Sequence, residues 1–282
     1  MSGSAIIRSQ RLLRERLGLH EDRMLLSFEA LCDSLRDRVE KIEWTCLWTP
    51  GIYVDNRFNV CFSAPGDQQS PTAILQMFEA LGVNHRHLSM PDELWSKLTS
   101  GINQRLFVGY AGSRLGSIPN PLLKITLPVN NYTQEVHEHL RRMWLPKLPA
   151  EMPPPTTNIM ITFATDGNGH CAPSLYLFYH SSDYDDNATY EYMTALVGAS
   201  VVRFLSSHSD SCISFKGIGT DRVYVPIDDL DAPFRTLVKV LSSGHTVLPD
   251  YADRVIGIGI PTSDVFREYI TEIELIIKLP RS

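Results

Sequence analysis

Apolar and polar residues alternate with two different periods along the chain, and the two periods follow one another in a repeated order. Spacing of three to four residues between apolar positions predicts helices over 4–17, 21–39, 70–84, 91–98, 132–145, 189–206 and 231–241. Alternation with period 2 predicts strands in pairs, over 41–48 with 52–63, 105–112 with 121–128, 156–165 with 173–180, 211–217 with 220–227, and 252–260 with 266–279. The pattern therefore predicts five helix-then-hairpin units that share an order of elements but almost no sequence identity.

Ten strands paired as hairpins and separated by helices favour an α+β fold, in which one closed antiparallel β-barrel is ringed by α-helices. A β-sandwich lacks room for five regular helices, and a parallel doubly wound sheet would need single strands between helices. The proline-rich stretch PKLPAEMPPP would suit a domain linker, but helix-then-hairpin units continue on both sides of it. We therefore expect a single domain over 1–282, with N-terminal helices in 4–39 and the barrel in 41–279.

If the helices pack outside the barrel, the outward strand faces must be apolar and the opposite faces point inward. In the strand at 121–128, for example, Leu123, Ile125 and Leu127 oppose Lys124 and Thr126. The same alternation places Tyr53 on one face with Arg57. The predicted inward faces carry three cations, three carboxylates, two tyrosines and a histidine, namely Arg57, Lys124, Arg222, Glu43, Glu272, Glu274, Tyr176, Tyr224 and His180.

These inward side chains suggest a particular chemistry. A ten-stranded barrel encloses more volume than an eight-stranded one, whose interior side chains just fill, so it has room for a ligand. Desolvated cations need an anion, and phosphate suits arginine and lysine. Tyrosine faces stabilise a carbocation, and a carboxylate accepts a proton. Together the groups would suit ionisation of an allylic diphosphate beside a nucleophile. The ordinary alternatives are solvated cations, core tyrosines and a surface His180 beside the loop SSDYDDN.

Composition narrows the class of protein. The chain of 282 residues is 43% hydrophobic and 21% charged with a net charge of −6, and no run of lysine and arginine indicates nucleic acid or an anionic membrane as a partner. Five cysteines without CxxC spacing indicate reduced, mostly buried thiols, and no apolar run reaches the roughly 18 residues of a membrane-spanning helix. The acidic residues Asp183, Asp185 and Asp186 are more typical of a solvated loop than of a metal site. We expect a cytoplasmic protein without direct metal ligands.

Four segments, in order along the chain, resemble the cyanobactin-type peptide prenyltransferases. This family has the ABBA fold, a ten-stranded barrel ringed by helices. The segments are IEWTCLWTPGIYVDNRF, YAGSRLGSIPNPLLKITLPV, CISFKGIGTDRVYVPIDD, and LPDYADRVIGIGIP followed by ITEIELIIKL. By position, the resemblance implies that Glu43 is the catalytic base or the group that orients the acceptor, that Arg57 and Lys124 bind diphosphate, and that Tyr176 and Tyr224 shield the prenyl cation.

The resemblance also bears on the donor and the acceptor. Phe215 stands where the family uses a bulky residue to limit the donor to five carbons, which implies dimethylallyl diphosphate, with Mg²⁺ bound through the diphosphate. Glu274 stands where the family often has a basic residue. If that residue binds diphosphate in the family, this chain must do without it or replace it with Arg114 or Arg222. Alternatively, Glu43, Glu272 and Glu274 form an anionic patch that binds a cationic acceptor such as an arginine side chain.

We therefore expect a prenyltransferase that moves a dimethylallyl group from dimethylallyl diphosphate to an Arg, Tyr or Trp side chain of a ribosomal peptide, cyclic or linear. Such a reaction belongs to the biosynthesis of ribosomally made, modified peptides. One alternative is prenylation of a small indole or phenol on the same fold. Another is a non-catalytic carrier whose barrel holds an apolar ligand, and this alternative predicts an interior without charge.

Overall fold

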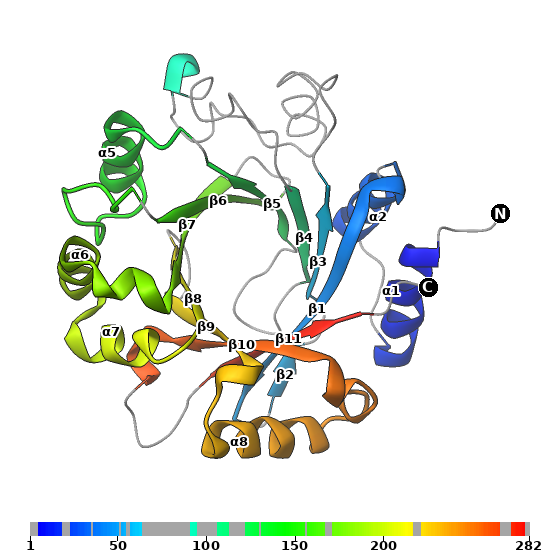
Figure 1. Ribbon diagram of the computed structural model, residues 1–282. Coiled ribbons are helices and arrows are strands. Elements are labelled where there is room, and N and C mark those ends of the chain that lie inside the picture. Colours follow the sequence, from blue (N-terminus) through cyan, green and yellow to red (C-terminus); the bar gives the residue numbers. More distant parts are fainter. Residues whose placement is uncertain are drawn as a thin grey trace.

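One closed antiparallel sheet forms the centre of the molecule (Figure 1). The computed structural model describes residues 5–18, 23–34, 36–50, 52–54, 57–63, 91–94, 106–112, 122–129, 131–155, 157–166, 171–216, 221–265 and 272–279. The strands are β1 (Val39–Thr49), β2 (Ile52–Val54), β3 (Arg57–Phe62), β4 (Leu106–Ala111), β5 (Leu122–Pro128), β6 (Asn158–Thr165), β7 (Cys171–His180), β8 (Asp210–Lys216), β9 (Arg222–Pro226), β10 (Val255–Pro261) and β11 (Ile273–Lys278).

The strands follow one another around the sheet in the order β11-β10-β9-β8-β7-β6-β5-β4-β3-β1-β2, and pairing of β11 with β1 closes the barrel. Strands β2 and β3 pair with successive parts of β1, β2 with 47–49 and β3 with 39–44, so together they act as one interrupted strand. The barrel therefore has ten strands when β2 and β3 are counted as one. The predicted closed, ten-stranded antiparallel barrel is confirmed.

Helices surround the barrel (Figure 1). The α-helices with bounds in the described ranges are α1 (Ala5–Leu17), α2 (Arg23–Ser34), α5 (Gln134–Met143), α6 (Asn187–Val197), α7 (Ala199–Ser206) and α8 (Ala232–Ser243). Helix α2 packs on β4 and β5, and α7 packs on β8. The sheet face that meets the helices is apolar and excludes water almost completely, as at Trp44, Phe58 and Ile125. Burying each such large side chain contributes about 1.5–3 kcal/mol, so this outer layer supplies most of the core.

Helix boundaries depart from the predicted ones where local geometry intervenes. The predicted helix over 21–39 ends at Ser34, because a short 3₁₀ turn over Arg36–Arg38 leads directly into β1. The predicted helix over 189–206 is divided at Gly198, whose φ of 86° lies in the region that favours glycine. The predicted helix over 70–84 lies outside the described residues, as does the second half, 95–98, of that over 91–98.

A one-residue change of register separates β2 from β3. Leu47 pairs with Val54, whereas Trp44 pairs with Phe58. As a result Tyr53 lies opposite Trp48 on the outer face, where its hydroxyl donates a hydrogen bond of 2.8 Å to the carbonyl of Leu241 in α8. Unbroken alternation, which placed Tyr53 on the same face as Arg57, is therefore wrong at this point.

The two ends of the barrel differ in their connections. At one end, which we call the hairpin end, β1 turns into β2, β4 into β5, β6 into β7, β8 into β9, and β10 into β11. At the other, the helix end, the chain leaves the barrel to form the surrounding helices. The proline-rich connector at 146–155 joins α5 to β6 within this arrangement, and one sheet continues on both sides of it. We propose on this basis that the chain forms a single domain. No helix in the described ranges is long and apolar enough to cross a membrane.

Candidate active site

Cross-strand pairing shows which side chains share the inner face of the barrel. Glu43 lies opposite Asn59, Asn59 opposite Gly109, and Gly109 opposite Lys124. Along each strand these residues alternate with the apolar residues of the outer face, so their side chains point to the inside of the barrel. On β5 and β7 the outward residues are buried while the inward ones retain solvent-accessible surface. The inner face is therefore not packed like a core, in agreement with the larger interior of a ten-stranded barrel.

A network of ionised groups crosses the interior at the hairpin end. Nη1 of Arg57 in β3 lies 3.2 Å from Oε1 of Glu274 in β11, and Nε of Arg222 in β9 lies 3.3 Å from Oε2 of the same carboxylate. Arg222 also pairs with Glu272. The hydroxyl of Tyr224 donates to Oε2 of Glu274 at 3.5 Å. Glu274 thus lies at the centre of the network.

The charge state of Glu274 follows from its neighbours. Burial by itself would raise the pKa of this carboxyl, but the guanidinium groups of Arg57 and Arg222 outweigh burial and hold the pKa at about 2. Burial opposes the charge of Arg57 too, yet Glu274 leaves the pKa of Arg57 raised above its ordinary value. Both partners are therefore ionised at any physiological pH.

Two lysines join the arginines on the inner face, and we call Arg57, Lys124, Lys216 and Arg222 the cation cluster. Burial, together with the charges of Arg57 and Lys216, holds the pKa of Lys124 well below its usual value. Burial and the charges of Arg222 and Arg57 lower the pKa of Lys216 to about 8, although Glu274 acts in the other direction. Within the described part of the chain, neither lysine forms an ion pair with a carboxylate.

The cation cluster therefore has more positive charge than its carboxylates balance. Glu272 and Glu274 are engaged by the two arginines, and the charge of Lys216 lowers the proton affinity of Lys124. A multivalent anion between these groups would relieve that repulsion. Lys216 was not among the candidates named from the sequence, although period-2 alternation along its strand places it on one face with Ser214. Ser214 lies directly opposite Arg222.

Two tyrosines lie beside the cation cluster. The rings of Tyr176 in β7 and Tyr224 in β9 have centroids 6.2 Å apart with an interplanar angle of 34°. Burial raises the pKa of both phenols, so they stay neutral at physiological pH. Tyr224 lies close against β10, because a Cβ atom at Gly259 would stand 2.5 Å from a ring carbon of this tyrosine. A side chain at position 259 would displace the ring.

Glu43 lies on the inner face but outside this network. Its carboxylate pairs with Lys41, with Nζ 2.6 Å from Oε1, and it lies opposite Lys278 across the β1–β11 pairing. The register places it beside Asn59, two residues along β3 from Arg57, which corresponds to about 7 Å of strand. Because the carboxylates of Glu272 and Glu274 meet arginines instead, the structure does not bring the three glutamates together as an anionic patch.

Two further candidates do not join the site. Phe215 lies opposite Leu175 on the outer face and is 4% exposed, so its ring packs among the apolar side chains under the helices. The structure gives no support to its expected role as a limit on donor length. Arg114 lies outside the described residues.

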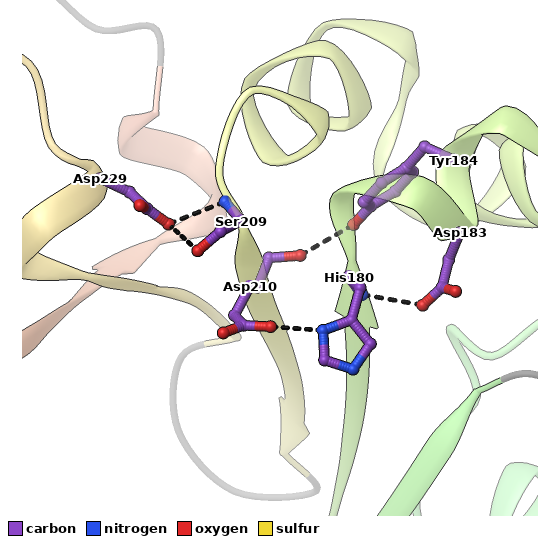
Figure 2. A network of polar contacts seen from close by, with 7 residues as sticks. His180, Asp183, Tyr184, Ser209, Asp210 and Asp229 are labelled. Carbon is purple, nitrogen blue, oxygen red and sulfur yellow. Dashed lines mark hydrogen bonds and ion pairs between the residues drawn. The ribbon is translucent and has the colours of Figure 1, made fainter.

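His180 lies at the helix end of β7 in a polar network of its own (Figure 2). Its Nδ1 contacts Asp210 at the start of β8, and its backbone N–H donates to Asp183 at 2.8 Å. The side chain of His180 is 64% exposed. These contacts fasten the ends of two strands, which agrees with the interpretation of His180 as a surface residue.

The acidic loop that follows has structural partners as well. Asp186 caps α6 by accepting a hydrogen bond of 2.9 Å from the backbone N–H of Thr189. Among the described residues, no group of three histidine, cysteine or acidic side chains is arranged to hold a metal ion. The five cysteines are buried thiols outside any disulfide, as expected, at Cys32, Cys46, Cys61, Cys171 and Cys212.

Comparison with known proteins gives similarity of shape alone. No protein-family model and no curated protein sequence matches the chain. A 5-dimethylallyl tryptophan synthase from Streptomyces coelicolor, solved with DMASPP and Trp, has a TM-score of 0.45 and 13% identity over 84% of this chain and 78% of its own. The 6-dimethylallyltryptophan synthase from Micromonospora olivasterospora has a TM-score of 0.45 and 14% identity over 84% of this chain and 81% of its own. AnaPT from Neosartorya fischeri has a TM-score of 0.44 and 10% identity over 86% of this chain and 78% of its own.

Similarity at this level assigns no function to the chain. What the chain's own residues provide is a closed barrel whose inner face holds a cation cluster, a buried carboxylate and two neutral phenol rings.

Proposed function

We propose that this protein is an ABBA-type prenyltransferase that moves a dimethylallyl group from dimethylallyl diphosphate to a side chain of a peptide. The observation that carries the proposal is the cation cluster on the inner face of the barrel. Two of its members, Lys124 and Lys216, have lowered pKa values and form no ion pair with any carboxylate of the described residues. A carrier of apolar ligands would need an interior without charge, whereas these residues make the interior strongly charged.

A diphosphate matches the demands of the cation cluster. It carries several negative charges over a short length, and its oxygens accept hydrogen bonds from both guanidinium and ammonium groups. Binding would raise the proton affinity of both lysines and restore full positive charge to the cluster. Mg²⁺, when bound to the diphosphate, would add further neutralisation of the leaving group.

The reaction would begin with cleavage of the bond between C1 of the dimethylallyl group and the diphosphate oxygen. The bonding electron pair leaves with the diphosphate, and the cation cluster stabilises the charge that develops there. The allylic cation that remains would be shielded by Tyr176 and Tyr224, whose ring faces attract a positive charge. Both phenols stay protonated, so they would not capture the cation as phenolates.

Transfer ends when the acceptor's nucleophilic atom forms a bond to the allylic carbon and loses a proton. We propose that Glu43 accepts this proton, because it is an inward carboxylate that the arginines of the cation cluster do not engage. Its partner Lys41 would hold the carboxylate in place on the same strand. In this proposal Glu272 and Glu274 would be counter-ions of Arg222 and Arg57 rather than ligands of the acceptor.

The donor and acceptor are proposed from the resemblance of the four sequence segments to peptide prenyltransferases. A five-carbon donor would be selected by residues of the inner face, since Phe215 is not among them. The acceptor would be an Arg, Tyr or Trp side chain of a ribosomal peptide.

A panel of acceptors tests this function. Cyclic and linear peptides that each carry one Arg, Tyr or Trp, together with free tryptophan, a simple indole and a simple phenol, are incubated with dimethylallyl diphosphate and analysed by mass spectrometry. Modification of a peptide supports the proposal. Modification of only the small aromatic compounds would assign the chain to small-molecule prenylation instead.

A further inference from the structure

The hairpin that joins β8 to β9 contains a nearly buried carboxylate between two members of the cation cluster. Asp221 directly precedes β9 and is 8% exposed. Its Oδ1 accepts a hydrogen bond of 3.0 Å from the backbone N–H of Lys216, the last residue of β8. Arg222 is the next residue along the chain. One carboxylate thus joins the backbone positions from which both hairpin cations extend.

Two other segments hold Asp221 in place. Nζ of Lys147, from the proline-rich connector, lies 2.7 Å from Oδ2 of Asp221. The side chain of Lys147 is 76% exposed while that of Asp221 is 9% exposed, so the pair gives the buried carboxylate a partner at little desolvation cost to the lysine. The carbonyl of Asp221 also accepts a hydrogen bond of 3.1 Å from the backbone N–H of Thr262, just beyond β10.

The charge of Asp221 acts on the cation cluster as well. Burial is the main cause of the lowered pKa of Lys216. The negative charge of Asp221 works against burial and raises the pKa of Lys216. Without this carboxylate, Lys216 would lose its proton at a lower pH. Geometry and electrostatics therefore act in the same direction, since both keep Lys216 ready to meet an anion.

We propose that Asp221 is a positioning residue of the anion site. It holds Lys216 and Arg222 in the arrangement that binds a diphosphate, without contacting the ligand, and Lys147 holds Asp221. This inference rests on the proposed function for the identity of the anion, and inorganic pyrophosphate serves as its probe.

The test compares pyrophosphate binding by calorimetry in wild-type protein and in Asp221→Asn, which keeps the shape of the side chain and removes its charge. The matched control is Asp229→Asn at the other end of the same strand pair, where Asp229 accepts a hydrogen bond of 2.7 Å from the backbone N–H of Ser209. We expect D221N to bind pyrophosphate about tenfold more weakly and D229N to bind it unchanged. In D221N, affinity should also begin to fall at a lower pH than in wild type, which a purely structural role would not cause.

Wild-type affinity and wild-type pH dependence in D221N would overturn the inference. If D221N does not fold, Lys147→Met decides, with the exposed Lys239→Met as its control. Weaker pyrophosphate binding by K147M supports the inference, and unchanged binding overturns it. A wild-type protein that binds pyrophosphate but transfers no prenyl group would refute the proposed function and leave the role of Asp221 standing, whereas one that binds no pyrophosphate would refute both.

Discussion

Arg57 of β3 and Glu274 of β11 meet across β1, the strand between them, with Nη1 3.2 Å from Oε1. The two residues are far apart in sequence and come together only because the last strand pairs with the first. Their ion pair holds one guanidinium of the cation cluster in a fixed orientation before any ligand arrives. A diphosphate would then bind to arginines that are already in position, which lowers the conformational cost of binding.

Removing the charge of Glu274 should destabilise the protein and make its stability depend on anions. We expect Glu274→Gln to lower the free energy of unfolding by about 3–5 kcal/mol, because it leaves Arg57 and Arg222 without their shared counter-ion. Pyrophosphate should restore more stability to this variant than to wild type. Thermal unfolding with and without pyrophosphate measures both effects.

A buried ion pair outside the barrel provides the control for this experiment. Glu29 of α2 pairs with Arg14 of α1 at 3.2 Å, with both side chains nearly inaccessible. Glu29→Gln should also lower the unfolding temperature but should gain no extra stability from pyrophosphate. An equal gain in both variants would contradict the placement of an anion site beside Glu274.

Replacing either lysine of the cation cluster should weaken anion binding without harming the fold. Lys124→Met and Lys216→Met each remove a cation that burial already disfavours, so we expect unchanged or higher unfolding temperatures. Pyrophosphate affinity should fall about tenfold or more in each variant, since a charged hydrogen bond is lost. Calorimetry measures the affinity, and Lys239→Met on the outside of α8 should match wild type. Full affinity in both lysine variants would show that the anion site lies elsewhere.

The lowered pKa of Lys216 predicts opposite effects of pH on binding and on folding. Pyrophosphate affinity should fall as pH rises through about 8, because Lys216 then loses its proton in the free protein. The unfolded chain keeps that proton up to the ordinary value of 10.5, so between the two values the unfolded state binds more protons and this group's contribution to stability rises with pH. Affinity titrations between pH 8 and 10.5 should show weaker pyrophosphate binding as pH rises, and denaturant unfolding over the same range should show a rising contribution of Lys216 to stability. A pH-independent affinity, or a pH dependence in K216M that equals that of wild type, would contradict the assignment.

The proposed base can be separated from the diphosphate site. Glu43→Gln should reduce prenyl transfer by about 10²–10⁴-fold, the usual contribution of a general base, and leave pyrophosphate affinity unchanged because Glu43 pairs with Lys41 rather than with the cation cluster. Steady-state transfer rates and calorimetry give the two readouts, with Glu191→Gln on the surface of α6 as the control. Full activity in E43Q would remove Glu43 from the mechanism.

Phe215 should be a core residue rather than a limit on donor length. Phe215→Ala is expected to lower the free energy of unfolding by about 3–5 kcal/mol, because a large buried ring is lost from the outer face. Its preference between dimethylallyl and geranyl diphosphate should match wild type. The comparison variant is Phe178→Ala, whose ring lies on the inner face opposite Cys212. Acceptance of geranyl diphosphate by F215A alone would restore the role that the sequence resemblance implied.

Alternation in the sequence predicted the architecture and most inward residues because parity persists along an unbroken strand. Lys124, Tyr176 and Arg222 lie on the inner face for this reason. The same rule was wrong for Tyr53, since nothing in the alternation marks the one-residue change of register before Arg57.

The partners of the inward residues could not be predicted in the same way. Contacts such as that between Arg57 and Glu274 depend on which strands close the barrel and on how far neighbouring strands are staggered. Sequence alternation carries no information about either. The pairing of Glu272 and Glu274 with arginines was not foreseen for that reason, because their arginine partners come from strands distant in the sequence.

The most direct test of the central claim is the release of diphosphate from dimethylallyl diphosphate by the purified protein, measured together with the mass of an acceptor peptide. We expect each diphosphate released to be matched by one five-carbon unit gained by the peptide, and both signals to be lost in a Lys124→Met Lys216→Met double variant. If the donor binds but stays intact with every acceptor, the barrel is a carrier and the claim of prenyl transfer is contradicted.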